Sequence, residues 1–211
     1  MINHKPSFAE EKLLRANGYL FIAGVDEVGR GALMGPVIAA AVMLPDNFKA
    51  RWKSRVRDSK LLSPGTREYL YGFIQDIAIS IGTGASSNKV IDSVGIAKAT
   101  RLAMIAAVEQ LKPQPQFLLI DYVRLSETSL PQKGIKHGDS LCFSIACASI
   151  IAKVTRDRLV TEMDRDFPGY GFARHKGYGT RKHIECLREK GPCRLHRRSF
   201  RPVAEMAGWE L

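Results

Sequence analysis

Apolar residues along the chain form two kinds of pattern: short continuous runs, and longer stretches in which they recur at helical spacing. The runs have strand length and predict strands at residues 20–25, 36–44, 77–85 and 117–120. The periodic stretches predict helices at residues 7–18, 63–75, 96–111 and 180–190, and one that begins near residue 139. Strands interleaved with helices indicate an α/β fold on a mixed sheet flanked by helices.

Several local features sharpen this outline. Gly29-Arg30-Gly31 makes a tight connection between the first two runs, so we expect them to pair as a hairpin. Ser7 and Glu10 have the spacing of a capping box and predict the start of the first helix. The helix near residue 139 is expected to bury a stripe formed by Leu141, Ile145, Ala148, Ala152 and Leu159.

The amino-acid composition indicates what kind of partner the protein binds. The chain has 211 residues, which suits one globular domain, and 45% of them are hydrophobic, as in a folded protein. Lys and Arg number 32 against 21 for Asp and Glu, which leaves a net charge of +11. Such a surplus favours a polyanionic partner, and nucleic acid is the first candidate because Lys and Arg neutralise phosphates.

The cellular location is predicted from the absence of a membrane-spanning segment and of a signal peptide in the sequence. The longest uncharged stretch, residues 31–45, is interrupted by Gly35 and Pro36, and it is shorter than the ~18 apolar residues of a membrane span. The first residues carry no apolar core of signal-peptide length, so we expect a cytoplasmic protein. The cysteines are too few for a disulfide framework and are expected as free thiols, at Cys142, Cys147, Cys186 and Cys193.

In a basic protein, the informative residues are acids at the ends of apolar elements. Asp26 and Glu27 end the first strand, Asp121 ends the fourth run, and Asp139 precedes the long apolar helix. Singly, Asp139 also suits a helix N-terminus and Asp121 a strand-end turn. Carboxylates that converge from three elements repel one another unless a cation lies among them. Oxygen ligands without His or Cys favour Mg²⁺ or Mn²⁺, and two such ions suit phosphodiester hydrolysis.

Two geometric points qualify this cluster. Neighbouring strand residues point to opposite faces, so we expect the strand to end or bulge at Asp26 and Glu27, with Gly29 and Gly31 permitting the irregularity. Asp157 lies 18 residues after Asp139. On one helix that separation is about 27 Å, so both cannot bind the same ions, and Asp157 is expected to pair with Arg156, Arg158 or a backbone group.

These residues belong to longer segments that resemble bacterial ribonuclease HII. The similarity runs in order over about residues 20–200. The segments that carry it are GVDEVGRG at 24–31, GPV at 35–37, DSKLL at 58–62, KHGDS at 136–140, IACASIIAKVTRD at 145–157, HKGYGT at 175–180 and HRRSF at 196–200.

The resemblance implies a ribonuclease H-like fold, with a catalytic core over about 20–165 and a basic, helical C-terminal extension over about 166–211 that binds substrate. It implies cleavage of RNA in RNA/DNA hybrids and at ribonucleotides in duplex DNA, leaving 3′-hydroxyl and 5′-phosphate ends. It assigns two divalent ions to Asp26, Glu27, Asp121 and Asp139. The implied substrate-binding residues are Gly29, Arg30, Gly31, Ser59, Lys60, Lys176 and Tyr178.

Some positions depart from the family pattern. The family usually has Gly where this chain has Tyr122, Asn where it has Gly95, and Ala where it has Cys147. Tyr122 puts the shape of the site's rim in question, and Cys147 reads as a packing change.

The basic, aromatic stretch after residue 166 has two interpretations. Aromatic rings beside cations suit stacking on nucleic acid, but they also pin loops by packing. For Tyr178, between two glycines, we favour stacking on the sugar after the RNA-to-DNA junction. For Phe167 and Phe172 we favour packing.

Three alternatives stay open at this point. His183, Cys186, Cys193 and His196 have a spacing that also suits a Zn²⁺ site. A non-catalytic nucleic-acid-binding protein would explain the charge but not the acids. A nuclease of the same fold acting on DNA junctions would use the acids but not the Gly-Arg-Gly turn. Without a recognisable dimer surface, we expect a monomer.

Overall fold

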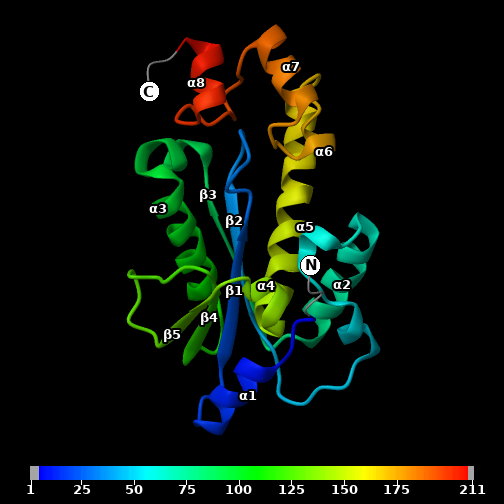
Figure 1. Cartoon of the computed structure of the whole chain (residues 1–211), viewed down its shortest axis with the longest axis vertical. Coiled ribbons are helices and arrows are strands. Elements are labelled where there is room, and N and C mark those ends of the chain that lie inside the picture. Colours follow the sequence, from blue (N-terminus) through cyan, green and yellow to red (C-terminus); the bar gives the residue numbers. More distant parts are fainter. Residues whose placement is uncertain (1–4, 209–211) are drawn as a thin grey trace.

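A five-stranded mixed sheet runs through the centre of the computed structural model, which describes residues 5–208 (Figure 1). The strands are β1 (Ile22–Val28), β2 (Val37–Met43), β3 (Ser80–Ser86), β4 (Phe117–Asp121) and β5 (Gln132–Ile135). Their order is β3-β2-β1-β4-β5. β1 and β2 form the expected antiparallel hairpin, β3 extends it, and β4 and β5 add parallel to β1. The mixed α/β architecture is therefore confirmed.

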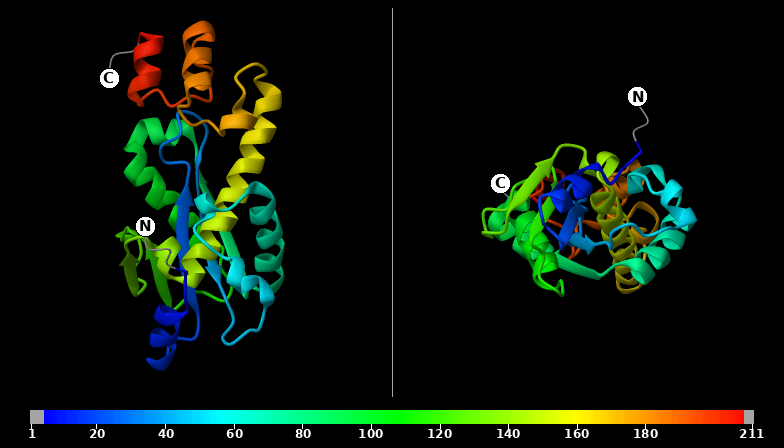
Figure 2. Two further views of the ribbon diagram at one scale, coloured as in Figure 1. Left: turned by 45° about the vertical axis from the view of Figure 1, so that its right-hand side comes forward. Right: turned by 90° about the horizontal axis from the view of Figure 1, so that it is seen from below.

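Helices cover both faces and one end of the sheet. Their bounds are α1 (Ala9–Ala16), α2 (Pro64–Ile77), α3 (Asn88–Glu109), α4 (Gly138–Leu141), α5 (Phe143–Asp166), α6 (Phe172–His175), α7 (Arg181–Lys190) and α8 (Arg201–Ala207), with short 3₁₀ turns η1 (Arg51–Arg55) and η2 (Ser59–Leu61). In Figure 1, α3 lies on one side of the sheet and α5 on the other, while α6, α7 and α8 gather at the end where β1 turns into β2 (Figure 2). No helix of residues 5–208 has the length and apolar character needed to cross a bilayer.

The core is two-sided, because small residues let helices approach the sheet closely. Every residue of β2 is buried, and its side chains alternate between the α3 side and the α5 side. On β1, a Cβ added to Gly24 would lie 2.2 Å from the carbonyl carbon of Ser144, at the start of α5. The strand and the helix backbone are thus in direct contact, which fixes β1 against α5.

Some predicted boundaries hold and others move. α2 begins where expected, with the Ser63 hydroxyl accepting from the Thr66 N–H at 3.2 Å, and Thr180 caps α7 in the same way. The capping box at Ser7 is wrong: α1 begins after Phe8 without a side-chain cap, because Ser7 pairs with the segment before α5 and donates to the Leu141 carbonyl at 3.0 Å. A tertiary pairing replaced the local motif.

The sheet's third and fifth strands also differ from expectation. β3 starts at Ser80, because Ile77 still belongs to α2. α3 starts at Asn88 rather than residue 96, with a break at Gly95 where φ is 78°. β5 was not predicted, because Gln132–Ile135 is a short, mostly polar edge strand with no apolar run.

The helix expected near residue 139 is two helices. Cys142 separates α4 from α5 with an extended backbone, φ −109° and ψ 129°. Ile145, Ala148 and Ala152 of α5 are buried as predicted. Leu141 is 41% exposed, so its place in the stripe is wrong: it belongs to α4, which the extended backbone at Cys142 separates from α5.

Candidate active site

The acidic residues at the ends of β1 and β4 come together. Asp26, Glu27 and Asp121 each offer a carboxylate oxygen, and these oxygens lie within 4.8 Å of one another. β1 and β4 pair in parallel up to Val25 and Ile120, so the next residues, Asp26 and Asp121, stand side by side on the same face. The topology of the sheet thus brings together two carboxylates that lie far apart in the sequence.

Glu27 joins the cluster without the irregularity expected from the sequence. β1 keeps regular pairing with β2 through Glu27 and Val28, so the prediction of a strand end or bulge at this point is wrong. On its other edge β1 has no partner after Val25, because β4 ends. The longer Glu27 side chain therefore reaches past that open edge to the same centre, where Arg30 Nη1 lies 3.4 Å from its Oε1.

Asp139 lies beside this group rather than within it. It is 5% exposed and belongs to the first turn of α4, not to its N-cap position, which is His137. The Gly138 N–H donates to Asp121 Oδ1 at 2.7 Å, and this bond fixes the start of α4 against the end of β4. Lys60 Nζ approaches Asp139 Oδ2 at 3.5 Å. Asp139 thus adjoins the cluster through its neighbour Gly138.

The cluster has more negative charge than its protein contacts neutralise. Burial raises the pKa of Asp26 well above its usual range, and repulsion from Glu27, Asp121 and Asp139 adds to the effect. Burial also raises the pKa of Glu27, although Arg30 opposes the shift. Glu27 Oε2 is buried with no hydrogen-bond partner. Buried oxygen ligands with an unused acceptor fit a hard divalent cation such as Mg²⁺ or Mn²⁺.

A further acid stands next to this centre and was not singled out from the sequence. Burial, together with repulsion from Asp139, raises the pKa of Asp58, whose Oδ1 accepts from the Lys60 N–H at 2.9 Å. Burial opposes the charge of Lys60, but attraction to Asp58, Asp139 and Asp26 raises the pKa of its ammonium. The only sequence signal for Asp58 is its place at the start of the DSK segment.

The Gly-Arg-Gly loop and Tyr178 lie together at the end of the hairpin. Ala32 pairs with Tyr178 in an antiparallel bridge, and the Leu33 N–H donates to the Gly177 carbonyl at 2.8 Å. Arg30 and Gly31 are exposed, and the Tyr178 ring is half-buried. Two predicted binding segments that are far apart in the chain therefore form one surface.

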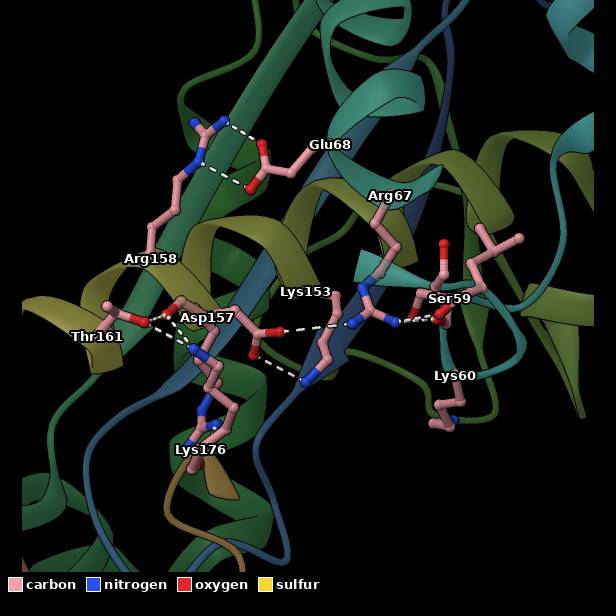
Figure 3. A network of polar contacts seen from close by, with 12 residues as sticks. Ser59, Lys60, Arg67, Glu68, Lys153, Asp157, Arg158, Thr161 and Lys176 are labelled. Carbon is pink, nitrogen blue, oxygen red and sulfur yellow. Dashed lines mark hydrogen bonds and ion pairs between the residues drawn. The ribbon is translucent and has the colours of Figure 1, made fainter. Parts of the chain in front are cut away.

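Ser59 and Lys176 are held by the protein itself. The Ser59 hydroxyl is buried against the Ser149 hydroxyl at 2.8 Å. Lys176 Nζ donates to Thr161 Oγ1 at 2.6 Å and to the Asp157 carbonyl at 3.3 Å, so its side chain turns toward α5 (Figure 3). Lys60, by contrast, extends away from this network and toward Asp139.

Asp157 pairs with Lys153 on its own helix and with Arg67 on α2, not with the adjacent arginines. Its carboxylate accepts from Lys153 at 2.8 Å and lies 3.8 Å from Arg67 Nη2 (Figure 3). The expected pairing with Arg156 or Arg158 is wrong, because Arg158 pairs with Glu68 and Arg156 donates to backbone carbonyls instead. An open groove of about 580 Å³ runs beside this network. It is lined by six basic and three acidic side chains: Arg67, Lys153, Arg158, Arg165, Arg174 and Lys176, with Glu68, Asp157 and Glu162.

The histidines and cysteines of the C-terminal part bond to one another and to the backbone. His183 Nε2 lies 3.1 Å from His196 Nε2, and the Cys186 thiol donates to the Gly169 carbonyl at 3.3 Å. Among residues 5–208, the only group of three or more His, Cys, Asp or Glu side chains with metal-binding spacing is the acidic one. The zinc alternative therefore gains no support. Phe172 is fully buried against Tyr170, as its packing interpretation requires.

The departures from the family pattern occupy special backbone positions. Tyr122 has φ 60° and Gly95 has φ 78°, the left-handed region in which Gly and Asn are the residues most readily accommodated. Tyr122 is 68% exposed and extends from the rim, while Cys147 is completely buried in the core.

Comparison with known proteins gives a consistent result. The family model described as Ribonuclease HII matches residues 23–203. Ribonuclease HII of Dehalococcoides mccartyi (strain BAV1) is 59% identical over 201 residues, which are 95% of this chain and 95% of that protein.

Solved structures share the fold. The ribonuclease H2 of Pyrococcus horikoshii OT3 matches with a TM-score of 0.75 at 24% identity, over 89% of this chain and 97% of that one. A Bst-RNase HIII structure in complex with Mn²⁺ matches with a TM-score of 0.66 at 19% identity, over 90% of this chain and 70% of that one. The expected ribonuclease H-like fold is confirmed, and the non-catalytic alternative is excluded. The chain belongs to the ribonuclease HII family and is a ribonuclease H.

Proposed function

We propose that this ribonuclease H cleaves RNA phosphodiester bonds in RNA/DNA hybrids and at ribonucleotides embedded in duplex DNA, and that it uses two divalent metal ions. The observation that carries the proposal is the carboxylate cluster of the buried Asp26 and the half-buried Glu27 and Asp121, which has a free acceptor at Glu27 Oε2 and Asp139 beside it. A catalytic centre that is negative inside a basic protein suits a polyanionic substrate.

The four acids would divide the work of holding the ions. Asp26 and Asp121 present their oxygens from one face of the sheet, Glu27 reaches them over the open strand edge, and Asp139 completes the set from α4. Mg²⁺ or Mn²⁺ bound there would activate water and neutralise charge on the leaving oxygen, which gives 3′-hydroxyl and 5′-phosphate products. Lys60, 3.5 Å from Asp139, holds that carboxylate in place and adds positive charge at the edge of the centre.

Recognition of RNA requires contact with the 2′-hydroxyl, which both donates and accepts. The Gly29-Arg30-Gly31 loop would bind the ribose and its phosphate, because its glycines let a backbone approach closely and Arg30 can bind phosphate. The adjoining Tyr178 ring would stack on the next sugar. Together with the neighbouring groove, the extension after about residue 166 would hold the duplex beside the core of about 20–165, within one domain.

The test is cleavage of a DNA duplex that carries one ribonucleotide, with Mg²⁺ or Mn²⁺ and with chelator. An all-DNA duplex of the same sequence separates this function from junction cleavage. We expect cleavage of the first substrate only, and none with chelator or with Asp121→Asn. Cleavage by Asp121→Asn at the wild-type rate would refute the site, and cleavage of the all-DNA duplex would refute the specificity.

A further inference from the structure

Two of the largest completely buried side chains in residues 5–208 are arginines, Arg156 of α5 and Arg197 before α8. Arg156 is 0% exposed and Arg197 is 0% exposed. Within the described part of the chain, neither guanidinium forms an ion pair with a carboxylate. Burying a charge in this way is costly, so an arrangement that does it twice at one place calls for a reason.

Both arginines bind backbone carbonyls, and nearly all of these belong to the loop that joins β1 to β2. Arg197 donates to Gly29 and Arg30 at 2.7 Å each and to Gly35 at 3.0 Å. Arg156 donates to Pro36 at 3.1 Å, to Met34 at 3.3 Å and to Lys176 at 2.9 Å. The two guanidinium groups therefore hold the loop from inside.

In this loop several backbone carbonyls are hydrogen-bonded, but several backbone N–H groups have no acceptor in the described part of the chain. The carbonyls of Gly29 and Arg30 are used by Arg197, whereas the N–H groups of Gly29, Arg30 and Gly31 donate to no acceptor within residues 5–208. A Cβ added to Gly29 would lie 2.2 Å from Arg156 Nε, so that guanidinium lies directly under the loop. At its exposed residues, Arg30 and Gly31, the loop thus presents unused donors above two positive charges, which suits phosphate and hydroxyl oxygens.

Arg156 also reaches the second recognition element. Its Cζ lies 5.5 Å from the centre of the Tyr178 ring, and its bond to the Lys176 carbonyl holds the segment that leads to Tyr178. One side chain therefore fixes the spacing between the Gly-Arg-Gly loop and the aromatic ring.

We propose that Arg156 and Arg197 are positioning residues for ribonucleotide recognition: they hold the amides of residues 29–31 and the Tyr178 ring in the arrangement that distinguishes a ribonucleotide from a deoxyribonucleotide. This inference rests on the proposed function, because it names the residues that make the same site selective for ribonucleotides. It predicts that loosening either guanidinium harms a substrate with one ribonucleotide more than a substrate with many, since a continuous RNA strand offers further registers.

The test uses Arg156→Lys and Arg197→Lys, which keep the charge but lose the forked hydrogen bonds. Arg101→Lys is the matched control, because Arg101 lies on α3, outside the groove and the loop, and its guanidinium pairs with Glu127 at 2.7 Å. The values of kcat and KM are measured on a duplex with one ribonucleotide and on an RNA/DNA hybrid. Circular dichroism and thermal unfolding report the fold.

We expect Arg156→Lys and Arg197→Lys each to lose on the order of tenfold to a hundredfold in kcat/KM on the single ribonucleotide, and clearly less on the hybrid, as small displacements of positioned groups do. Arg101→Lys should leave the ratio between substrates unchanged. Equal losses on both substrates, or none, in folded variants would overturn the inference. If the wild type failed to cut the single-ribonucleotide duplex, the proposed function itself would fall.

A second route covers variants that fold poorly. Hydrogen exchange of the wild type should show slow amides at Leu33 and Gly35, which are bonded within the protein. It should show fast amides at the exposed Arg30 and Gly31, which become protected when a ribonucleotide-containing duplex is added with Ca²⁺ in place of the activating ion. An equal protection of these amides by the all-DNA duplex would contradict the assignment.

Discussion

The carboxylates around Asp26 and the histidines around His183 are both clusters of titratable groups with a buried centre, yet their hydrogen bonding differs. Burial raises the pKa of Asp26 and Glu27, and Glu27 Oε2 lacks a partner. Burial lowers the pKa of His183 and of His196 to about 4 in each case, which keeps both rings neutral near pH 7. The acidic cluster therefore has more negative charge than its protein contacts neutralise, whereas the histidine cluster carries no charge near pH 7.

Hydrogen bonding explains why the histidine cluster needs nothing more. The Cys193 N–H donates to His196 Nδ1 at 2.9 Å, so His196 carries its proton on Nε2 and donates it to His183 Nε2 at 3.1 Å. His183 then donates from Nδ1 to the Tyr178 carbonyl at 3.0 Å. Every ring nitrogen is used. A set of ligand residues therefore indicates a metal only where lone pairs remain unused.

The largest effect should come from neutralising the acidic cluster. Asp26→Asn removes one charge and one ligand without changing shape, so we expect cleavage to fall by about a thousandfold, the several kcal/mol that bound metal contributes to a transition state. The variant should also unfold at a higher temperature without metal, because repulsion is relieved. Asp46→Asn, at an exposed acid, is the control. A metal-free variant less stable than the wild type would contradict the account of the cluster.

The next effect should be stabilisation by metal, which we expect from the acidic cluster and not from the histidine cluster. Saturating Mg²⁺ or Mn²⁺ should raise the unfolding free energy of the wild type by about 1–3 kcal/mol, as a ligand does at 10 to 100 times its Kd. Thermal unfolding with added metal and with chelator measures this effect, and Asp26→Asn should lose most of it. An undiminished gain in that variant would place the ions elsewhere.

The histidine cluster should make the unfolding free energy depend on pH. Its pKa values lie below the usual 6.5, so the unfolded chain binds more protons and stability falls as pH drops from about 6.5 to about 4. We expect a loss of roughly 3 kcal/mol for each ring. Denaturant unfolding across this range measures it. His183→Gln should flatten the dependence, whereas His137→Asn, at an exposed histidine, should not.

The smallest effect is expected at the thiol beside the histidines. Cys193 Sγ lies 3.2 Å from His196 Nδ1, but the backbone N–H of the same residue already fixes the proton on the ring. Cys193→Ser should therefore change the unfolding free energy by less than about 0.5 kcal/mol, a typical surface value. A much larger loss, measured by denaturant unfolding, would show that the thiol contributes to holding the ring.

The sequence predicts those features that depend on local pattern. The hairpin follows from two apolar runs around a glycine turn, α2 and α7 follow from Ser63 and Thr180, and the acids are visible as polar residues that end apolar strands. Glu27 was harder to place: its route to the cluster depends on where β4 stops beside β1, which no local pattern records.

The remaining differences arise from tertiary contacts. Arg156 and Arg197 look like surface cations in the sequence, because nothing local shows that carbonyls of a distant loop will surround them. Asp157 pairs with Lys153 one helical turn earlier and with Arg67 on α2, 90 residues away in the chain, rather than with the adjacent Arg156 or Arg158. Likewise, the break at Cys142 is imposed by the pairing of Phe143 with Ser7 and not by a helix-breaking residue.

Gly24 sets how closely β1 approaches α5 beside the acidic centre. With no side chain between β1 and the first turn of α5, the sheet that carries Asp26 and the chain that carries Asp139 meet backbone to backbone, and an added Cβ would stand 2.4 Å from the Ile145 nitrogen. Hydrogen is the only substituent this junction admits. The width of the proposed ion-binding centre is consequently set at Gly24, two residues before Asp26, by a residue that has no side chain to bind anything.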